Sequence, residues 1–335
     1  MMSVLQVDGL HTYFDTENGI VRAVEGVDFS IEPGEIVGLV GESGSGKSVT
    51  ASSIMNLVER PGRIAEGTVR YDGQDVFDLS KSELQDLRGG EISMVFQDPM
   101  NAFNPTQTVG RQLHDVLRTH RNGAVHPVKR ILGLDHDEDC KEAVVEMLDA
   151  VGIPNPEARY SDYPHEFSGG MIQRAMVGMA LLCDPKLVLA DEPTTGLDVS
   201  IERQILELFN DLVEELNTAV LWITHDLSVV AKLCDRVVVM YAGKVMEVGP
   251  TDVVLSDPAN PYTEALLDSI PRYDRPDEEI RVIEGDVPDP LNRPDGCRFA
   301  DRCPKVHERC HDAHPPQYEL GDREVACYLA EEGTK

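Results

Sequence analysis

The feature that most constrains the fold is a glycine-rich octapeptide between a predicted strand and a predicted helix. Residues 35–40 form an apolar run before it, and a helical pattern covers 49–59 after it. The octapeptide reads Gly41, Glu42, Ser43, Gly44, Ser45, Gly46, Lys47, Ser48. This order fits the P-loop pattern, in which backbone N–H groups face phosphate oxygens, the lysine reaches the β- and γ-phosphates and the serine hydroxyl ligates Mg²⁺. The sequence therefore predicts a nucleotide site on an α/β sheet.

Further apolar runs alternate with helical patterns, which favours a parallel sheet with both faces covered. These runs are residues 186–191, 219–224 and 236–241. The first ends in Asp191 and Glu192, and carboxylates at the carboxyl end of a parallel strand lie in the crevice where nucleotide binds. We expect Asp191 to hold Mg²⁺ through water and Glu192 to polarise the attacking water; alternatively, the pair only caps a loop. His225, after the next strand, could contact the γ-phosphate or be structural.

A second glycine-rich turn lies between the P-loop and the acidic strand. Residues 167–173 read Phe-Ser-Gly-Gly-Met-Ile-Gln, and two glycines at a helix start form another anion site. Here the chain resembles the ATP-binding cassette (ABC) ATPases. The resemblance implies that Ser168, Gly169 and Gly170 bind the γ-phosphate held by a partner subunit's P-loop. Phe167 and Met171 depart from the commonest form of this turn and leave the phosphate-facing residues intact.

The resemblance covers residues 1–250 and implies roles for other residues. Gln97 matches the family's Q-loop, which senses Mg²⁺ and the membrane partner, and Asp198 matches its D-loop. The aromatic residue that stacks on adenine is Tyr13 or Phe14, and we favour Phe14. The resemblance thus implies an ATP hydrolase with Glu192, His225 and Gln97 as catalytic residues. The nucleotide would contact residues 41–49, including Val49, and Mg²⁺ would be held by Ser48, Gln97 and Asp191.

The family implies a P-loop NTPase cassette with a parallel core sheet, an antiparallel β subdomain and an inserted helical subdomain. We expect the ATPase domain at residues 1–257 and the helical subdomain at about 106–183, where no good strand pattern is present. After about residue 257 the chain is rich in Pro, Asp and Arg, which predicts a linker and a small Cys-rich module within 258–335. Residues 122–140 resemble an exposed polar insertion, to which we assign no function.

The C-terminal segment narrows the family. Residues 260–271, 285–290, 296–304 and 324–328 resemble the C-terminal extension of ATPases from dipeptide, oligopeptide and nickel importers.

That extension contains four cysteines with the spacing C-x5-C-x6-C-x16-C, namely Cys297, Cys303, Cys310 and Cys327. A disulfide is disfavoured in a reducing cytosol. Four thiolates in a small module suit a metal centre, and the tight C-x2–4-C knuckle typical of zinc is absent. Members of this subfamily are reported to carry a [4Fe–4S] cluster at matching cysteines, so the resemblance favours that cluster over Zn²⁺.

The net charge constrains the surroundings of the protein. Asp plus Glu total 60 against 30 Lys plus Arg, which gives −30. Residues 251–335 contain 20 acidic and 10 basic residues, so their net charge is −10 and that of residues 1–250 is −20. A dispersed acidic surface argues against a nucleic-acid binder. A salt-rich cytosol tolerates such a surface because screening removes self-repulsion, so we hypothesise a halophilic source.

We therefore predict the ATP-hydrolysing subunit of an ABC importer for di- or oligopeptides, with nickel or an oligosaccharide as alternative substrates. No apolar run approaches the roughly 18 residues that cross a bilayer, and no secretory signal is visible. We expect a peripheral protein at the cytoplasmic face of the membrane. Its partners would be a second, different ABC ATPase subunit, two transmembrane permease subunits and an extracellular substrate-binding protein. A soluble ABC ATPase acting on DNA or ribosomes is the alternative class, which the single cassette and the acidic charge disfavour.

Overall fold

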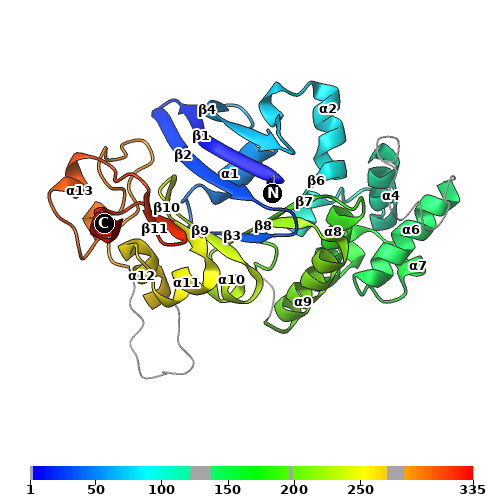
Figure 1. The fold of residues 1–335 in the computed structure, drawn as a ribbon. Coiled ribbons are helices and arrows are strands. Elements are labelled where there is room, and N and C mark those ends of the chain that lie inside the picture. The colour runs from blue at the N-terminus through cyan, green and yellow to red at the C-terminus, as the bar shows by residue number, and fades with distance from the viewer. Residues whose placement is uncertain (1–2, 121–136, 196–198, 270–282, 335) are drawn as a thin grey trace. The chain divides into compact units, whose positions relative to one another are not determined.

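The computed structural model describes residues 3–120, 137–195, 199–269 and 283–334 (Figure 1). The chain divides into two compact units. The terminal unit consists of Met1–Phe77 and Trp222–Lys335, and the central unit is Asp78–Leu221. Among the described residues, no helix combines the length and the apolar character that a membrane span requires.

An antiparallel sheet forms the first part of the terminal unit. Its strands, in the order β2-β1-β4-β5, are β2 (Gly19–Ile31), β1 (Leu5–Thr16), β4 (Gly62–Tyr71) and β5 (Gln74–Asp75). Along β1, Leu5, Val7 and Leu10 are buried. The buried positions change from odd-numbered to even-numbered residues after Val7, because a β-bulge lies at Gly9. Gly9 has a φ of 54°, which glycine adopts without strain. The bulge therefore keeps the apolar side chains of β1 on one face.

A second sheet of the terminal unit contains the predicted buried strands. Its order is β11-β12-β10-β9-β3, with β11 (Tyr318–Leu320), β12 (Arg323–Val325), β10 (Lys244–Pro250), β9 (Arg236–Tyr241) and β3 (Ile36–Val40). The strands β3 and β9 pair in parallel, whereas β9, β10, β12 and β11 are antiparallel neighbours. The parallel pair confirms the predicted core, and the antiparallel part was not predicted.

The terminal unit also contains several helices. They are α1 (Lys47–Ile54), α10 (Leu227–Leu233), α11 (Thr251–Ser256), α12 (Pro261–Asp268), the 3₁₀ helix η4 (Ala300–Arg302), α13 (Arg309–Asp312) and the 3₁₀ helix η5 (Tyr328–Thr334). The start of α12 is set by Asn260, whose side chain accepts from the Tyr262 amide, and by Pro261 at the first helical position. The segment just after residue 257 is therefore partly helical.

The central unit combines two parallel strands with a set of helices. It contains α2 (Lys81–Asp86), the π-helical turn η2 (Leu87–Glu91), β6 (Ile92–Val95), α3 (Pro99–Ala102), α4 (Val109–His120), α6 (Asp137–Ala150), α7 (Pro156–Arg159), the 3₁₀ helix η3 (Pro164–Glu166), α8 (Gly169–Leu181), β7 (Leu187–Asp191) and α9 (Val199–Leu216). β6 pairs with β7 in parallel, and β7 also neighbours β8 (Ala219–Thr224). The stretch 106–183 is helical wherever regular structure is described. Residues 122–136 of the expected insertion lie outside the described part of the chain.

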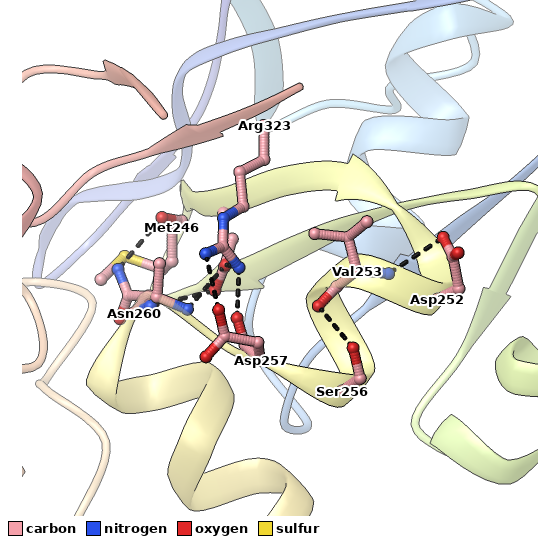
Figure 2. Close-up of polar contacts among 9 residues, drawn as sticks. Met246, Asp252, Val253, Ser256, Asp257, Asn260 and Arg323 are labelled. Carbon is pink, nitrogen blue, oxygen red and sulfur yellow. Dashed lines mark hydrogen bonds and ion pairs between the residues drawn. The ribbon is translucent and has the colours of Figure 1, made fainter. Parts of the chain in front are cut away.

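A polar cluster around the buried Glu247 anchors the C-terminal hairpin β11–β12 (Figure 2). Arg323 of β12 donates to the backbone carbonyl and the carboxylate of Asp257, and its guanidinium lies 3.6 Å from the carboxylate of fully buried Glu247. Glu247 accepts from the amide of Asn260 at 3.1 Å. The Asn260 side chain in turn donates to the Ala326 carbonyl at 3.1 Å. These contacts hold the C-terminal strands against β10.

Candidate nucleotide-binding site

The P-loop connects β3 to α1, as the sequence predicts, within the terminal unit. Lys47 is the first residue of α1 and is only 6% exposed. Its ammonium donates to the carbonyls of Gly41 at 2.8 Å and Glu42 at 3.1 Å, and to the Ser45 hydroxyl at 3.4 Å. Ser48, the next residue, is exposed. The loop therefore curls around the lysine that is expected to reach the phosphates.

Two P-loop positions require glycine because the backbone of neighbouring strands is too close for a side chain. A Cβ atom at Gly41 would lie 2.1 Å from the Met240 carbonyl oxygen of β9. A Cβ atom at Gly46 would lie 2.6 Å from the Ala23 carbonyl oxygen of β2, and Gly46 has a φ of 104°. Steric contact with both sheets of the terminal unit thus defines the path of the loop.

Tyr13 and Phe14 occupy opposite faces of β1, which separates the two candidates for the adenine contact. Tyr13 packs edge-on against His11, with ring centroids 6.0 Å apart. Phe14 shares its face with Thr12, whose hydroxyl is 2.7 Å from the hydroxyl of Ser53 in α1. Phe14 therefore lies on the face of β1 directed toward the P-loop helix.

His225 follows β8 and belongs to the terminal unit. The imidazole is exposed. The next residue, Asp226, caps α10 by accepting from the Ser228 amide at 2.7 Å, and its own amide donates to the Thr224 hydroxyl at 2.9 Å. His225 is thus presented from a well-defined strand-to-helix turn.

The central unit brings together two predicted catalytic residues that are far apart in the sequence. Glu192 follows β7 and has a left-handed φ of 48°, which is uncommon for a residue with a side chain. Its Oε2 accepts from the Gln97 amide nitrogen at 3.1 Å and from the Thr195 hydroxyl at 2.9 Å. Asp191, at the end of β7, is 6% exposed. Two hydrogen bonds therefore orient the carboxylate expected to polarise water.

The Ser-Gly-Gly turn begins α8, as predicted. Ser168 is the N-cap, and its hydroxyl accepts from the Met171 amide at 3.3 Å. Ser168 and Gly169 are exposed, whereas a Cβ atom at Gly170 would lie 3.0 Å from the Ile201 side chain of α9. The helix N-terminus is thus accessible at the surface of the central unit. Asp198 lies outside the described residues.

The four C-terminal cysteines line one cavity of about 20 Å³. Each is half-buried. Burial raises the pKa of the Cys297 thiol to about 11; a backbone hydrogen bond at Phe299 opposes the rise, and the neighbouring Cys310, Cys327 and Cys303 thiols add to it. No set of three or more His, Cys, Asp or Glu side chains is arranged around a metal position in the described part of the chain. The four cysteines therefore share one cavity.

Three residues near the predicted site were missed by sequence reasoning. Thr195, which bonds to Glu192, belongs to an Asp-Glu-Pro-Thr-Thr run whose last threonine had no assigned partner. Tyr262 and Arg302 both contact Glu42 of the P-loop. They lie in segments that the resemblance had singled out, but spacing along the chain does not reveal which distant residue each one contacts.

Comparison with known proteins identifies the class. The family model described as ABC transporter matches residues 24–195. The model described as oligopeptide/dipeptide transporter, C-terminal region, matches residues 246–310. The dimeric structure of MJ0796, a bacterial ABC transporter cassette, is similar to this chain with a TM-score of 0.63 and 28% identity, and covers 74% of this chain and 98% of the cassette. MJ0796 bound to ADP and Pi in a post-hydrolysis state gives the same TM-score at 27% identity and the same coverage.

Curated relatives match nearly the whole chain. The oligopeptide transport ATP-binding protein AppD of Bacillus subtilis (strain 168) is 45% identical over 334 residues, which are 99% of this chain and 98% of AppD. OppD of Salmonella typhimurium is 46% identical over 325 residues, 97% and 93% of the two chains. The dipeptide transport ATP-binding protein DppD of Escherichia coli (strain K12) is 41% identical over 328 residues, 98% and 97% of the two chains.

The fold, the P-loop and these matches define an ATP hydrolase of the ABC transporter class. Within that class, the chain belongs to the family of oligopeptide and dipeptide transport ATP-binding proteins.

Proposed function

We propose that this chain energises the import of di- or oligopeptides by hydrolysing ATP. The observation that carries the proposal is the match to peptide-transport ATP-binding proteins at 41–46% identity over almost their full length. That match includes residues 246–310, which fit the model described as oligopeptide/dipeptide transporter, C-terminal region. The C-terminal segment thus supports a peptide substrate over the broader range of ABC cargoes.

In this proposal the P-loop residues 41–49 bind the ATP phosphates, with Lys47 on the β- and γ-phosphates and Phe14 against adenine. Ser48, Asp191 and Gln97 would hold Mg²⁺, and the ion would supply positive charge against the phosphates. Glu192 polarises the attacking water. The hydrogen bond from Gln97 to the Glu192 carboxylate supports the last role, because it links the metal-sensing residue to the proposed base.

The proposed importer contains two ATPase cassettes. The exposed N-terminus of α8, with Ser168, Gly169 and Gly170, would face the γ-phosphate held by a second, different ATPase subunit, and Asp198 would lie at the same interface. His225 would contact the γ-phosphate in its own subunit. Two transmembrane permease subunits and an extracellular substrate-binding protein would complete the importer, with this chain peripheral on the cytoplasmic face of the membrane.

Affinity purification from detergent-solubilised membranes tests the assembly, and reconstitution into proteoliposomes tests the cargo. We expect two permease subunits and a different ABC ATPase to copurify, and labelled peptide to accumulate only with ATP. Accumulation of nickel or an oligosaccharide in place of peptide would show that the proposed peptide substrate is wrong. Recovery of ribosomes or DNA without permeases would overturn the importer itself and favour a soluble ABC ATPase.

We further propose that Cys297, Cys303, Cys310 and Cys327 hold a [4Fe–4S] cluster. Four thiols lining one cavity provide the donor set that such clusters use. Anaerobic purification followed by iron and acid-labile sulfide assays should find about four of each per chain. A Cys303→Ser variant should lose the iron, whereas Cys140→Ser, in α6, should retain it. A colourless wild-type protein with stoichiometric zinc would replace the cluster by a Zn²⁺ site.

We also propose that the chain is adapted to a salt-rich cytosol. The support is the net charge of −30, which is distributed over both parts of the chain.

A further inference from the structure

Arg302 of the 3₁₀ helix η4 holds Glu42 of the P-loop in a bidentate ion pair. The two nitrogen–oxygen distances are 2.6 Å from Nη1 to Oε2 and 3.0 Å from Nη2 to Oε1. The side chains are only 5% and 25% exposed. The contact joins residues 260 positions apart. Two parallel charge-assisted hydrogen bonds restrict the orientation of the Glu42 carboxylate as well as its position.

The guanidinium of Arg302 is itself fixed by three further acceptors. Its Nη1 also donates to the Tyr241 hydroxyl at 3.0 Å, Nη2 to the Ile283 carbonyl at 3.1 Å, and Nε to the Glu284 carbonyl at 3.1 Å. With the two bonds to Glu42, these contacts match the five N–H donors of a guanidinium. Arg302 therefore cannot release Glu42 by rotating without breaking other hydrogen bonds.

A second residue beyond position 250 holds the backbone of Glu42. The Glu42 amide donates to the Tyr262 hydroxyl at 3.0 Å. Tyr262 of α12 packs against Tyr241 and Phe299, with ring centroids 4.5 and 5.2 Å apart, and all three rings are at most 2% exposed. Both the side chain and the amide of Glu42 are thus attached to a rigid aromatic cluster.

Glu42, which these contacts hold, is itself hydrogen-bonded to Lys47, the residue expected to bind the phosphates. Lys47 donates to the Glu42 carbonyl at 3.1 Å, so the peptide held by Arg302 and Tyr262 supplies one of the acceptors that position the Lys47 ammonium. We propose that Arg302 is a positioning residue for the P-loop, through which the C-terminal extension sets the affinity for ATP. The inference rests on the ATP site proposed above and adds a residue outside the cassette motifs.

The test measures ATP hydrolysis and binding of a fluorescent ATP analogue in the full chain. For Arg302→Gln we expect the KM for ATP and the analogue Kd to rise roughly tenfold, as is typical of coupling between sites, while kcat at saturation is kept. Glu42→Gln breaks the same pair from the other side and should give the same shift. The double variant should bind ATP no more weakly than either single variant, because the two substitutions remove the same ion pair.

The matched control is Lys305→Ala, which removes a 2.6 Å ion pair with Glu264 of α12 inside the extension, where both side chains are about half exposed. Its ATP affinity should equal that of the wild type. If Arg302→Gln fails to fold, Arg302→Lys, which keeps a cation but cannot form the bidentate pair, decides the question. Unchanged affinity in the Arg302 variant that folds, or equal weakening by Lys305→Ala, would overturn the positioning role. Failure of the wild-type chain to bind ATP would instead overturn the proposed site.

Discussion

At the scale of single residues, the sharpest expectation concerns Glu192. Glu192→Gln keeps an oxygen that can accept from Gln97 and Thr195 but removes the charge that polarises water. We expect ATP hydrolysis to fall by roughly 10²–10⁴-fold, the usual contribution of a general base, while ATP binding persists. Turnover assays and size-exclusion chromatography with ATP would measure both effects, and the ATP-bound dimer should accumulate.

A suitable control for this variant is Glu207→Gln in α9, which neutralises an exposed carboxylate of the same unit that pairs with Arg203 at 2.7 Å. This variant should hydrolyse ATP at the wild-type rate. Full turnover in Glu192→Gln would remove Glu192 from the role of base and leave Asp191 or His225 to be tested in its place.

Residue motifs predicted the path of the P-loop between β3 and α1, but not the distant residues that contact this loop. The P-loop pattern predicts glycines at positions 41 and 46, and the structure adds a tertiary reason, because carbonyl oxygens of β9 and β2 leave no room for a Cβ atom. For the contact with adenine, in contrast, Phe14 was favoured over Tyr13 on the family resemblance. The structure shows that the two side chains lie on opposite faces of β1. The pair formed by Arg302 and Glu42 depends on chain folding across most of the sequence, so no local spacing encodes it.

At the scale of elements, the sequence predicted the strands that are apolar along their whole length and missed the short strands of the C-terminal hairpin. β3, β7, β8 and β9 are nearly continuous apolar runs, which only a covered sheet explains. β12 has three residues, two of them charged, and exists because its Arg323 finds acceptors at Asp257 and beside Glu247 (Figure 2). Tertiary partners rather than strand propensity therefore place it in the sheet.

This reasoning predicts that Arg323→Ala detaches the C-terminal hairpin. Removing the cation leaves the buried Glu247 carboxylate without its ionic partner, which typically costs about 3–5 kcal/mol. Urea-induced unfolding followed by circular dichroism would measure the loss. Arg309→Ala, which removes an exposed 2.7 Å pair with Glu331, should cost about 1 kcal/mol or less.

The same variant should change the pH dependence of stability. Burial already raises the pKa of Glu247, against its hydrogen bonds and the Arg323 charge, which lower it. A carboxyl group whose folded-state pKa is raised loses its contribution to stability as pH rises through that pKa, because the folded state disfavours the charged form. Without Arg323 that pKa rises further. The penalty of Arg323→Ala should therefore be smaller at acidic than at neutral pH, and a pH-independent penalty would assign the loss to packing alone.

At the scale of the whole molecule, charge is the property that the motifs leave unexplained. The net charge of −30 is shared by residues 1–250 and 251–335, so repulsion acts throughout the chain. Exposed ion pairs such as Arg63 with Asp15 and Arg70 with Asp8 offset only part of it and are themselves weak. Because opposite charges are scarce, the folded chain should depend on dissolved cations.

Thermal unfolding across a salt series tests this dependence. Raising KCl from about 0.1 M to about 1 M shortens the Debye length from about 10 Å to about 3 Å, so repulsion between neighbouring surface carboxylates is largely screened. We expect the Tm to rise over that range and ATP hydrolysis to rise with it. Sucrose at matched osmolality is the control, because an excluded solute favours compactness without screening charge. A Tm that is highest in dilute buffer, or an equal gain with sucrose, would contradict adaptation to salt.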